Sequence, residues 1–217
     1  MAYGHFLGRA IREASRLGMV NFHGSVLPKY RGASPVETAI ASGESETGVS
    51  LMQIDQEMDT GAVADIESVK IEKSDSASSV RVKIGEATVP ILERSMIPLM
   101  KNELKFNPQN EALVSHCRKL AKEDGMIDFE LSAVDIYNRW RAFKTWPNSF
   151  CFHEENRIKV GRLEVSEDTS AKNISSLPYG SVILEKDKLR VTTSSGLLRI
   201  FELQRAGGKM LPVSDFL

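Results

Sequence analysis

The alternation of apolar and polar residues predicts a first half that mixes helices with strands. Apolar residues recur near a period of 3.6 over residues 2–17, which predicts a helix that Gly18 ends. A short strand is expected over 19–23. Two more are expected over 47–54 and 61–71, joined as a hairpin by an acidic turn. This order of elements is typical of an open α/β sheet.

Two further segments of the first half have helical patterns. Pro35 suits the first turn of a short helix that Gly43 would end. The long pattern over 75–100 begins at a Ser/Asp cluster suited to capping, and Pro90 is expected to kink or divide it.

The second half changes to short strands. Helices are expected over 111–122 and 132–143, after a polar connector that contains proline. Five strand candidates follow, at residues 149–153, 158–165, 180–185, 189–194 and 197–204. Turn signals stand at 186–187 and 194–196. Short strands in this number indicate a small barrel of the OB type.

The connector is the predicted domain boundary. The fold class expected is α/β, with a partial open α/β (Rossmann-like) domain over 1–106, a linker over 107–111 and an OB-like β-barrel domain over 112–217. Parallel strands of an open sheet need neighbours on both sides. Too few strands precede residue 75, so earlier strand–helix units of this sheet are expected to be missing.

Composition is that of a soluble globular protein, with 41% hydrophobic and 26% charged residues. No apolar run approaches the roughly 18–20 residues that span a membrane, and no secretory signal is visible. The net charge of −1 excludes a protein that is basic throughout. Cys117 and Cys151 lie far apart without metal-ligand spacing, so free thiols and no metal are expected.

Candidate chemistry begins where the first predicted strand ends. Asn21 and His23 share one face of that strand because strand side chains alternate. Ligands of open α/β sheets bind outside the carboxyl ends of strands, where an amide and an imidazole can act on a reacting carbonyl. A single histidine on a strand is more often structural, so the pairing alone leaves both interpretations open.

Asp59 stands in the acidic turn of the predicted hairpin. An Asp-Thr-Gly sequence is common in turns, which gives Asp59 a purely structural interpretation. The alternative is a carboxylate that orients His23 and stabilises its protonated form. Sequence spacing alone does not decide between the two.

Several motifs occur together in one order. An Asn-x-His is followed by a Ser-x-Leu-Pro-x-x-x-Gly loop over 25–32, and Asp59 comes 36 residues after His23. This set closely resembles the folate-dependent formyltransferase family. Segments 119–129, 141–150 and 204–217 are similar to the linker and C-terminal domain of the methionyl-tRNA formyltransferases within that family.

The resemblance implies an activity and its partners. It implies transfer of a formyl group from 10-formyltetrahydrofolate to the α-amine of initiator methionyl-tRNA, in translation initiation. It also implies a monomer without a metal or a membrane association. A bacterial cytoplasm is the expected location, with the mitochondrion as the alternative.

The resemblance also assigns roles to residues. Asn21, His23 and Asp59 are the implied catalytic residues. The implied folate and substrate loop contributes Ser25, Leu27, Pro28, Lys29, Arg31 and Gly32. Contacts with tRNA phosphates are the suggestion for five cations, each of which has solvated surface as the alternative: Lys144, Arg157, Lys159, Arg162 and Arg205.

Alternatives from other classes remain open. Family members carry a further half sheet ahead of the segment that begins this chain, so the chain is expected to lack the front part of the catalytic domain. One alternative is therefore an inactive fragment, and another is a remnant that only binds tRNA. A third is a formyltransferase for another amine, such as that of a sugar nucleotide.

Overall fold

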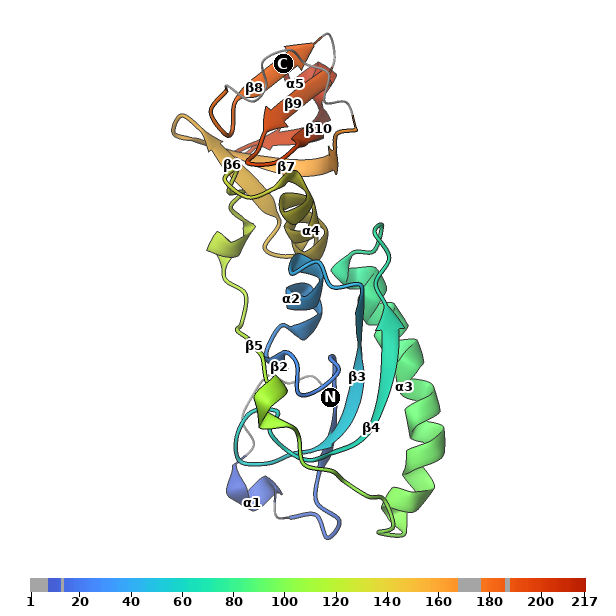
Figure 1. Cartoon of the computed structure of the whole chain (residues 1–217). Helices are drawn as coiled ribbons and strands as arrows, with labels where there is room; N and C mark the ends of the chain where they lie inside the picture. Colours follow the sequence, from blue (N-terminus) through green and yellow to red (C-terminus); the bar gives the residue numbers. More distant parts are fainter. Residues whose placement is uncertain (1–7, 13, 168–176, 186–187) are drawn as a thin grey trace. The chain divides into compact units, whose positions relative to one another are not determined.

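The structure is a computed structural model that describes residues 8–12, 14–167, 177–185 and 188–217. The chain divides into two compact units (Figure 1). The first comprises Met1–Ile40 and Glu44–Leu120, and the second comprises Ala41–Gly43 and Ala121–Leu217. Within the described ranges no helix is both long and apolar enough to cross a membrane.

The first unit is built on a three-stranded antiparallel sheet. The strand order is β1 (Val20–His23), β3 (Glu46–Gln53) and β4 (Val63–Lys70). The predicted hairpin is confirmed, because β3 and β4 pair along their length. In contrast to the expected parallel arrangement, β1 runs antiparallel to β3. Parallel pairing in this unit is a two-residue contact between β2 (Arg31–Gly32) and β5 (His116–Cys117).

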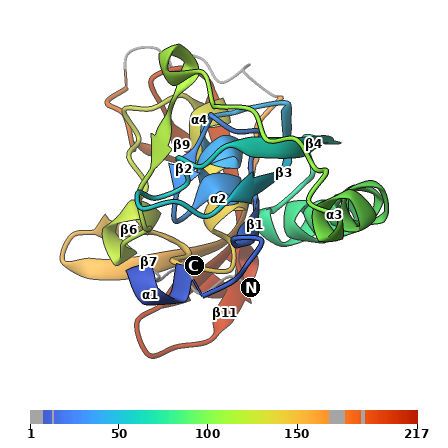
Figure 2. The ribbon, with the colours of Figure 1, turned by 90° about the horizontal axis from the view of Figure 1, so that it is seen from below.

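One helix covers one face of this sheet. α3 (Ala77–Met100) begins at Ser76, whose side chain accepts from the Ser79 amide while the Ser79 hydroxyl accepts from the Ser76 amide. This capping box confirms the predicted start, and the helix continues through Pro90. Val49, Leu51 and Ile91 form the core between helix and sheet. Figure 1 and Figure 2 show α3 along β3 and β4, with α2 (Pro35–Ala41) on the other side.

The helix predicted over residues 2–17 is only partly visible. Residues 1–7 and 13 lie outside the described part of the chain. Within that part the segment holds one short helix, α1 (Arg9–Arg12), followed by turns up to Gly18, which has a φ of +74°. The sequence predicted that Gly18 ends a helix, whereas in the structure Gly18 ends a turn.

The helix predicted over 111–122 is wrong. The segment holds a 3-10 turn (Glu111–Leu113), then β5, and a second 3-10 turn begins at Lys122. The Asn110 side chain accepts from the Ala112 amide and starts the first turn. Beyond it the backbone is extended, because its polar groups pair with the loop that contains β2. Tertiary hydrogen bonds thus override the local pattern.

The connector expected at 107–111 packs on the first unit. Asn107 and Val63 exchange both backbone hydrogen bonds at 2.9 Å. The division between the two units falls later, between Leu120 and Ala121. The polar, proline-containing composition of the connector reflects irregular backbone that is held by hydrogen bonds.

The second unit combines a helix with an antiparallel sheet. Its elements are α4 (Ala133–Phe143), β6 (Ser149–His153), β7 (Asn156–Val165), β8 (Val182–Glu185), β9 (Lys188–Thr192), β10 (Leu197–Arg205), β11 (Met210–Pro212) and α5 (Val213–Phe216). The strand order is β6-β7-β10-β9-β8, and β11 pairs with β10. The predicted helix at 132–143 and all five strand candidates are confirmed, although the turn at 186–187 lies outside the described residues.

The core of the second unit lies between α4 and this sheet. Ile136 and Trp140 of α4 pack with Leu163, Leu198 and other strand residues. Among the described residues no pairing joins β8 to β6, so the sheet is not seen to close. A closed OB-like barrel stays a prediction.

Candidate active site

The end of β1 and the turn between β3 and β4 bring a histidine and a carboxylate together. His23 is the last residue of β1 and is 6% exposed. The Asp59 Oδ2 atom lies 3.5 Å from His23 Nδ1. Asp59 has a φ of +58°, a conformation that aspartate tolerates better than most residues because its short side chain bonds locally. The hairpin therefore brings His23 and Asp59, which are far apart in sequence, into contact.

The other ring nitrogen of His23 faces a second acceptor. His23 Nε2 lies 2.9 Å from the carbonyl oxygen of Tyr30. A neutral imidazole has one N–H, whereas an imidazolium has two and can donate to both oxygens. Each ring nitrogen of His23 thus faces one oxygen atom, that of Asp59 or that of Tyr30. To act directly on a substrate, the ring must release one of these partners.

Asn21 lies on the same face of β1 as His23. The two side chains are two residues apart along a strand, which places them roughly 7 Å from each other. Phe22 points to the opposite face, where it packs with Val49 and Leu51 against α3. The structure therefore brings Asn21, His23 and Asp59 to one side of the sheet.

Hydrogen bonds from buried serine hydroxyls hold the loop from Ser25 to Gly32. The buried Ser25 hydroxyl donates to the Lys29 carbonyl at 2.6 Å. The Ser50 hydroxyl donates to the Ser25 carbonyl and accepts from the amide of Leu27, whose side chain is buried and whose peptide bond to Pro28 is cis. Lys29 is exposed and lies 3.5 Å from Glu44. Of the loop side chains, Lys29 is thus the one that presents a charge to solvent.

Gly32 links this loop to Asp59. Its amide donates to Asp59 Oδ2 at 2.8 Å. Its φ is +124°, and a Cβ there would lie 2.0 Å from the Cys117 carbonyl oxygen. A side chain at this position would clash with β5, so the close approach requires glycine.

Arg31, which the resemblance assigned to the folate and substrate loop, is buried in the structure. The residue is 3% exposed, and its Nε donates to the Gln109 side chain at 3.0 Å. Its two terminal nitrogens donate to the Glu111 carboxylate at 3.3 and 2.8 Å. This fork of bonds holds the guanidinium inward, and it keeps the pKa of the Glu111 carboxyl below its ordinary value.

Sequence reasoning missed three residues around the site. Gln109 Nε2 lies 2.8 Å from the Asp59 carbonyl oxygen. The Ser115 hydroxyl accepts from the Tyr30 amide at 2.9 Å, and Cys117 Sγ lies 3.2 Å from the Tyr30 carbonyl oxygen. Gln109 lies in the connector, and Ser115 and Cys117 lie in the segment whose pattern predicted a helix, so no signal in the sequence placed them beside the site. Burial raises the pKa of the Cys117 thiol, so the thiol form is favoured.

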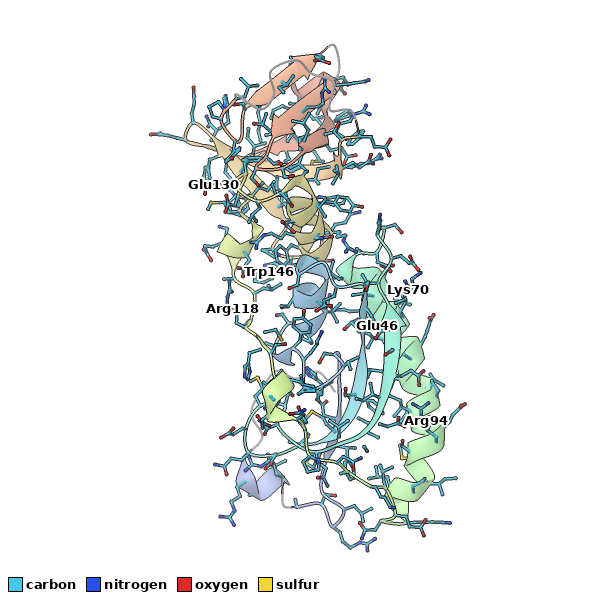
Figure 3. The ribbon with its side chains drawn as sticks, in the orientation of Figure 1. Glu46, Lys70, Arg94, Arg118, Glu130 and Trp146 are labelled. Atoms are coloured by element: carbon cyan, nitrogen blue, oxygen red, sulfur yellow. The ribbon has the colours of Figure 1, made fainter. Side chains whose placement is uncertain are left out.

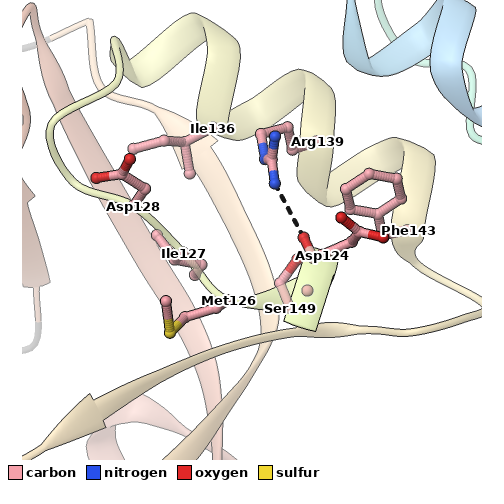
Figure 4. Close-up of a pocket in the computed structure, with 9 residues that line it drawn as sticks. Asp124, Met126, Ile127, Asp128, Ile136, Arg139, Phe143 and Ser149 are labelled. Atoms are coloured by element: carbon pink, nitrogen blue, oxygen red, sulfur yellow. Dashed lines mark hydrogen bonds between the residues drawn. The ribbon is translucent and has the colours of Figure 1, made fainter. Parts of the chain in front are cut away.

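Two cavities differ greatly in size. A cavity of about 10 Å³ in the second unit is lined by Asp124, Arg139 and Phe143 among others, and Arg139 donates to the Asp124 carbonyl beside it (Figure 4). It holds at most one water. An open groove of about 350 Å³ in the first unit is lined in part by Leu27, Pro28 and Gln109. Of these two, only the groove has the size of a small-molecule site.

No cluster of three or more metal-binding side chains occurs among the residues that the structure describes. Asp59 has His23 and the Gly32 amide as its neighbours. These contacts orient a carboxylate for hydrogen bonding.

The five cations suggested for tRNA lie in the second unit and differ in exposure and in the rings they contact. Lys159 and Arg162 stand on the side of β7 that faces away from the core residues Val160 and Leu163. Arg157 packs 3.8 Å above the Phe150 ring, and both Arg157 and Lys159 are partly buried. The exposed cations also contact rings, with Lys144 over Trp140, Arg162 over Phe201 and Arg205 over Phe216. Arg162 in addition donates to Glu164 at 2.7 Å. What distinguishes Lys159 and Arg162 is therefore that they share the outer side of β7.

Comparison with known families agrees with this architecture. Residues 1–96 match the family model described as formyl transferase. Residues 119–217 match the model described as formyl transferase, C-terminal domain. Together the two models leave only residues 97–118 unmatched. The chain belongs to the formyltransferase family.

Solved structures with the same fold come from several kinds of formyltransferase. An N-formyltransferase from Helicobacter canadensis, in complex with folinic acid and dTDP-3-aminofucose, has 21% identity and a TM-score of 0.66. HypX from Aquifex aeolicus in complex with tetrahydrofolic acid has 19% identity and a TM-score of 0.66. Methionyl-tRNA formyltransferase from Clostridium thermocellum has 20% identity and a TM-score of 0.56.

The chain is shorter than these proteins. The matches cover 84%, 91% and 80% of this chain, in the same order. They cover 65%, 34% and 68% of the three other chains. At these identities the likeness defines the fold and leaves the acceptor of the formyl group open.

Proposed function

We propose that this chain transfers a formyl group from 10-formyltetrahydrofolate to the α-amine of initiator methionyl-tRNA. The observation that carries the proposal is the His23–Asp59 contact at 3.5 Å, on the same face of the sheet as Asn21. An amide, an imidazole and a carboxylate on one face of a sheet are suited to acyl transfer. The family to which the chain belongs supports formyl transfer as the reaction.

Asn21 acts on the formyl oxygen. The neutral amine attacks the formyl carbon, and the carbonyl oxygen gains negative charge as the tetrahedral intermediate forms. The Asn21 side-chain N–H donates a hydrogen bond to that oxygen. One donor of this kind contributes roughly 10²–10³ in rate.

His23 and Asp59 manage charge and protons. The amine loses one proton, the bond from the formyl carbon to N10 breaks, and N10 gains one proton as tetrahydrofolate leaves. A protonated His23, held by Asp59, stabilises the oxyanion or relays the proton, a role that contributes roughly 10²–10⁴. Asp59 keeps the ring oriented and stabilises its charge.

The groove of about 350 Å³ is our candidate for part of the folate site. Leu27 and Pro28, two of the loop residues that the sequence suggested, line it. Folinic acid and tetrahydrofolic acid in the structures from Helicobacter canadensis and Aquifex aeolicus support a folate donor. In the second unit, Lys159 and Arg162 support a tRNA acceptor, whether or not the sheet closes as an OB-like barrel.

A sugar-nucleotide amine is the second candidate acceptor. The TM-score with the Helicobacter canadensis enzyme, which holds dTDP-3-aminofucose, is 0.66, against 0.56 for the methionyl-tRNA enzyme. Both acceptors present a primary amine, so the same three residues serve either one.

The test is a formyl-transfer assay with the 217-residue chain and both acceptors. We expect transfer to methionyl initiator tRNA, a fall in kcat of roughly 10²–10⁴ for His23→Ala, and a similar fall for Asp59→Asn. Glu103→Gln removes an exposed carboxylate from the same unit and serves as the control.

Three results would contradict the proposal. Transfer to dTDP-3-aminofucose with none to tRNA would establish the second candidate. Full activity in His23→Ala would exclude the proposed site. Folded protein that transfers to neither acceptor would show an inactive chain, and tRNA binding by that protein would then indicate a binding remnant.

A further inference from the structure

The segment that neither family model matches makes hydrogen bonds to the loop and the turn that carry the candidate site. Residues 97–118 lie between the matched regions, yet Gln109, Ser115 and Cys117 of this segment all contact the loop or turn that carries the site. We infer that Gln109 is a positioning residue for formyl transfer, and that it acts by fixing the backbone of Asp59. The inference rests on the proposed function.

Gln109 holds the Asp59 turn from its backbone side. Its Nε2 donates to the carbonyl oxygens of Asp59 and Gly61, each at 2.8 Å. Gly61 itself packs tightly, since a Cβ there would lie 2.0 Å from the Gln53 carbonyl oxygen. One amide group therefore fixes two peptide units on either side of Thr60.

The oxygen of the same side chain is also held. Gln109 Oε1 accepts from Arg31 Nε at 3.0 Å, and Arg31 is held by Glu111 as well. A primary amide has two donor hydrogens and one acceptor oxygen, and here both kinds of group are used. Because the oxygen is bonded to a buried guanidinium, the amide cannot rotate without breaking a charge-assisted bond.

This arrangement locks the two halves of the site together. Arg31 belongs to the loop whose Tyr30 carbonyl faces His23 Nε2. Asp59 belongs to the turn whose carboxylate faces His23 Nδ1. Gln109 bonds to both segments, so it sets the distance between the two acceptors that hold the imidazole. A shift of about 1 Å in such a distance can cost roughly 10²-fold in rate.

Two variants, Gln109→Glu and Gln109→Met, distinguish the contribution of the Gln109 N–H groups from that of its acceptor oxygen. Both remove the N–H groups that bind the Asp59 and Gly61 carbonyls, and both keep the length of the side chain. Glu retains an acceptor for Arg31, whereas Met does not. Gln204→Ala in the second unit is the control, because it also removes an amide that donates to a carbonyl, that of Gly208 at 2.7 Å.

The expected result is a loss of rate with little loss of binding. We expect kcat to fall roughly 10–100-fold in both Gln109 variants while KM for the amine acceptor changes less than about twofold, and no change in Gln204→Ala. The Gly32 amide, which donates to Asp59 Oδ2, provides a readout that needs no activity. We expect its proton resonance to move upfield and its hydrogen exchange to accelerate in both variants.

The outcomes of the two proposals are distinguishable. If the wild-type chain transfers formyl groups and both Gln109 variants keep wild-type kcat and Gly32 exchange, the positioning role is excluded and the proposed function stands. If the wild-type chain is inactive, the Gly32 amide still decides: an unchanged resonance and exchange rate would overturn the role of Gln109. A fall in kcat in Gln109→Met alone would assign the effect to Arg31.

Discussion

At the scale of single residues, the candidate site depends on backbone conformations that few residues adopt. Tyr30 and Asp59 both have positive φ values, of +59° and +58°. Gly32 has a φ of +124° and lies against the Cys117 carbonyl. The order of motifs predicted that Asn21, His23 and Asp59 belong together, but these conformations depend on contacts with a distant segment. The buried environment of Arg31 depends on the same contacts, so no pattern within the loop sequence indicated it.

Gly32→Ala tests this dependence. The added Cβ meets a carbonyl oxygen, and alanine is strained at this φ, so we expect the free energy of unfolding to fall by roughly 1–3 kcal/mol. Gly85→Ala is the matched control, since Gly85 lies in α3 and a Cβ there meets nothing within 4 Å. It should raise the free energy of unfolding by roughly 0.5–1 kcal/mol. Urea denaturation measures both, and equal effects would refute the expected contrast.

At the scale of elements, the hydrophobic pattern predicted the helices and strands whose formation depends on local sequence. Alternating residues identified β1, β3 and β4, and the Ser76 cap with its apolar pattern identified α3. The connector after α3 was harder, because its structure is decided by partners. Asn107 pairs with β4 and β5 pairs with β2, and both partners are more than 40 residues away in sequence. A pattern within a short window contains no information about such contacts.

The contact between α3 and β4 has a measurable pH dependence. Arg94, labelled on α3 in Figure 3, donates to both Asp65 oxygens of β4, at 2.6 and 2.9 Å. These hydrogen bonds lower the pKa of Asp65 from its ordinary value of 3.8, although burial opposes them. A lowered pKa in the folded state stabilises the protein above pH 3.8, and this stabilisation is lost as the pH falls through the folded-state pKa.

Arg94→Met should therefore flatten the acid side of the stability profile. We expect it to lower the free energy of unfolding by roughly 0.5–1 kcal/mol near neutral pH, because the pair is partly exposed. Between about pH 5 and pH 2 the variant should lose less stability than the wild type. Chemical denaturation at a series of pH values measures this, with Lys101→Met as the control. Parallel profiles for wild type and variant would show that the pair contributes nothing.

At the scale of the whole molecule, the proposed reaction uses the two units for different tasks. The first unit holds the candidate site, and the second holds the cations suggested for tRNA. A net charge of −1 provides no long-range attraction for nucleic acid. Local placement must therefore supply it, and Lys159 and Arg162 offer this on the outer side of β7.

Replacing both cations by glutamine should weaken tRNA binding in a salt-dependent way. Each phosphate contact that is lost should reduce the slope of log K against log salt concentration by roughly 0.7–0.9. Filter binding at several salt concentrations measures the slope, and the pair Lys101→Gln and Lys105→Gln in the first unit is the control. Equal slopes for the two double variants would assign Lys159 and Arg162 to ordinary solvated surface.

The two cysteines fall one in each unit. Cys117 is buried beside Tyr30 in the first unit, and Cys151 packs against the core of the second. Both are free, and burial raises the pKa of both thiols. The buried Cys117 thiol reacts with a disulfide reagent only when its surroundings open, whereas the Cys151 thiol is partly exposed. Labelling rates of the two thiols, resolved by mass spectrometry, would therefore report on the two units separately, and the rate at Cys117 would measure the opening of the first unit.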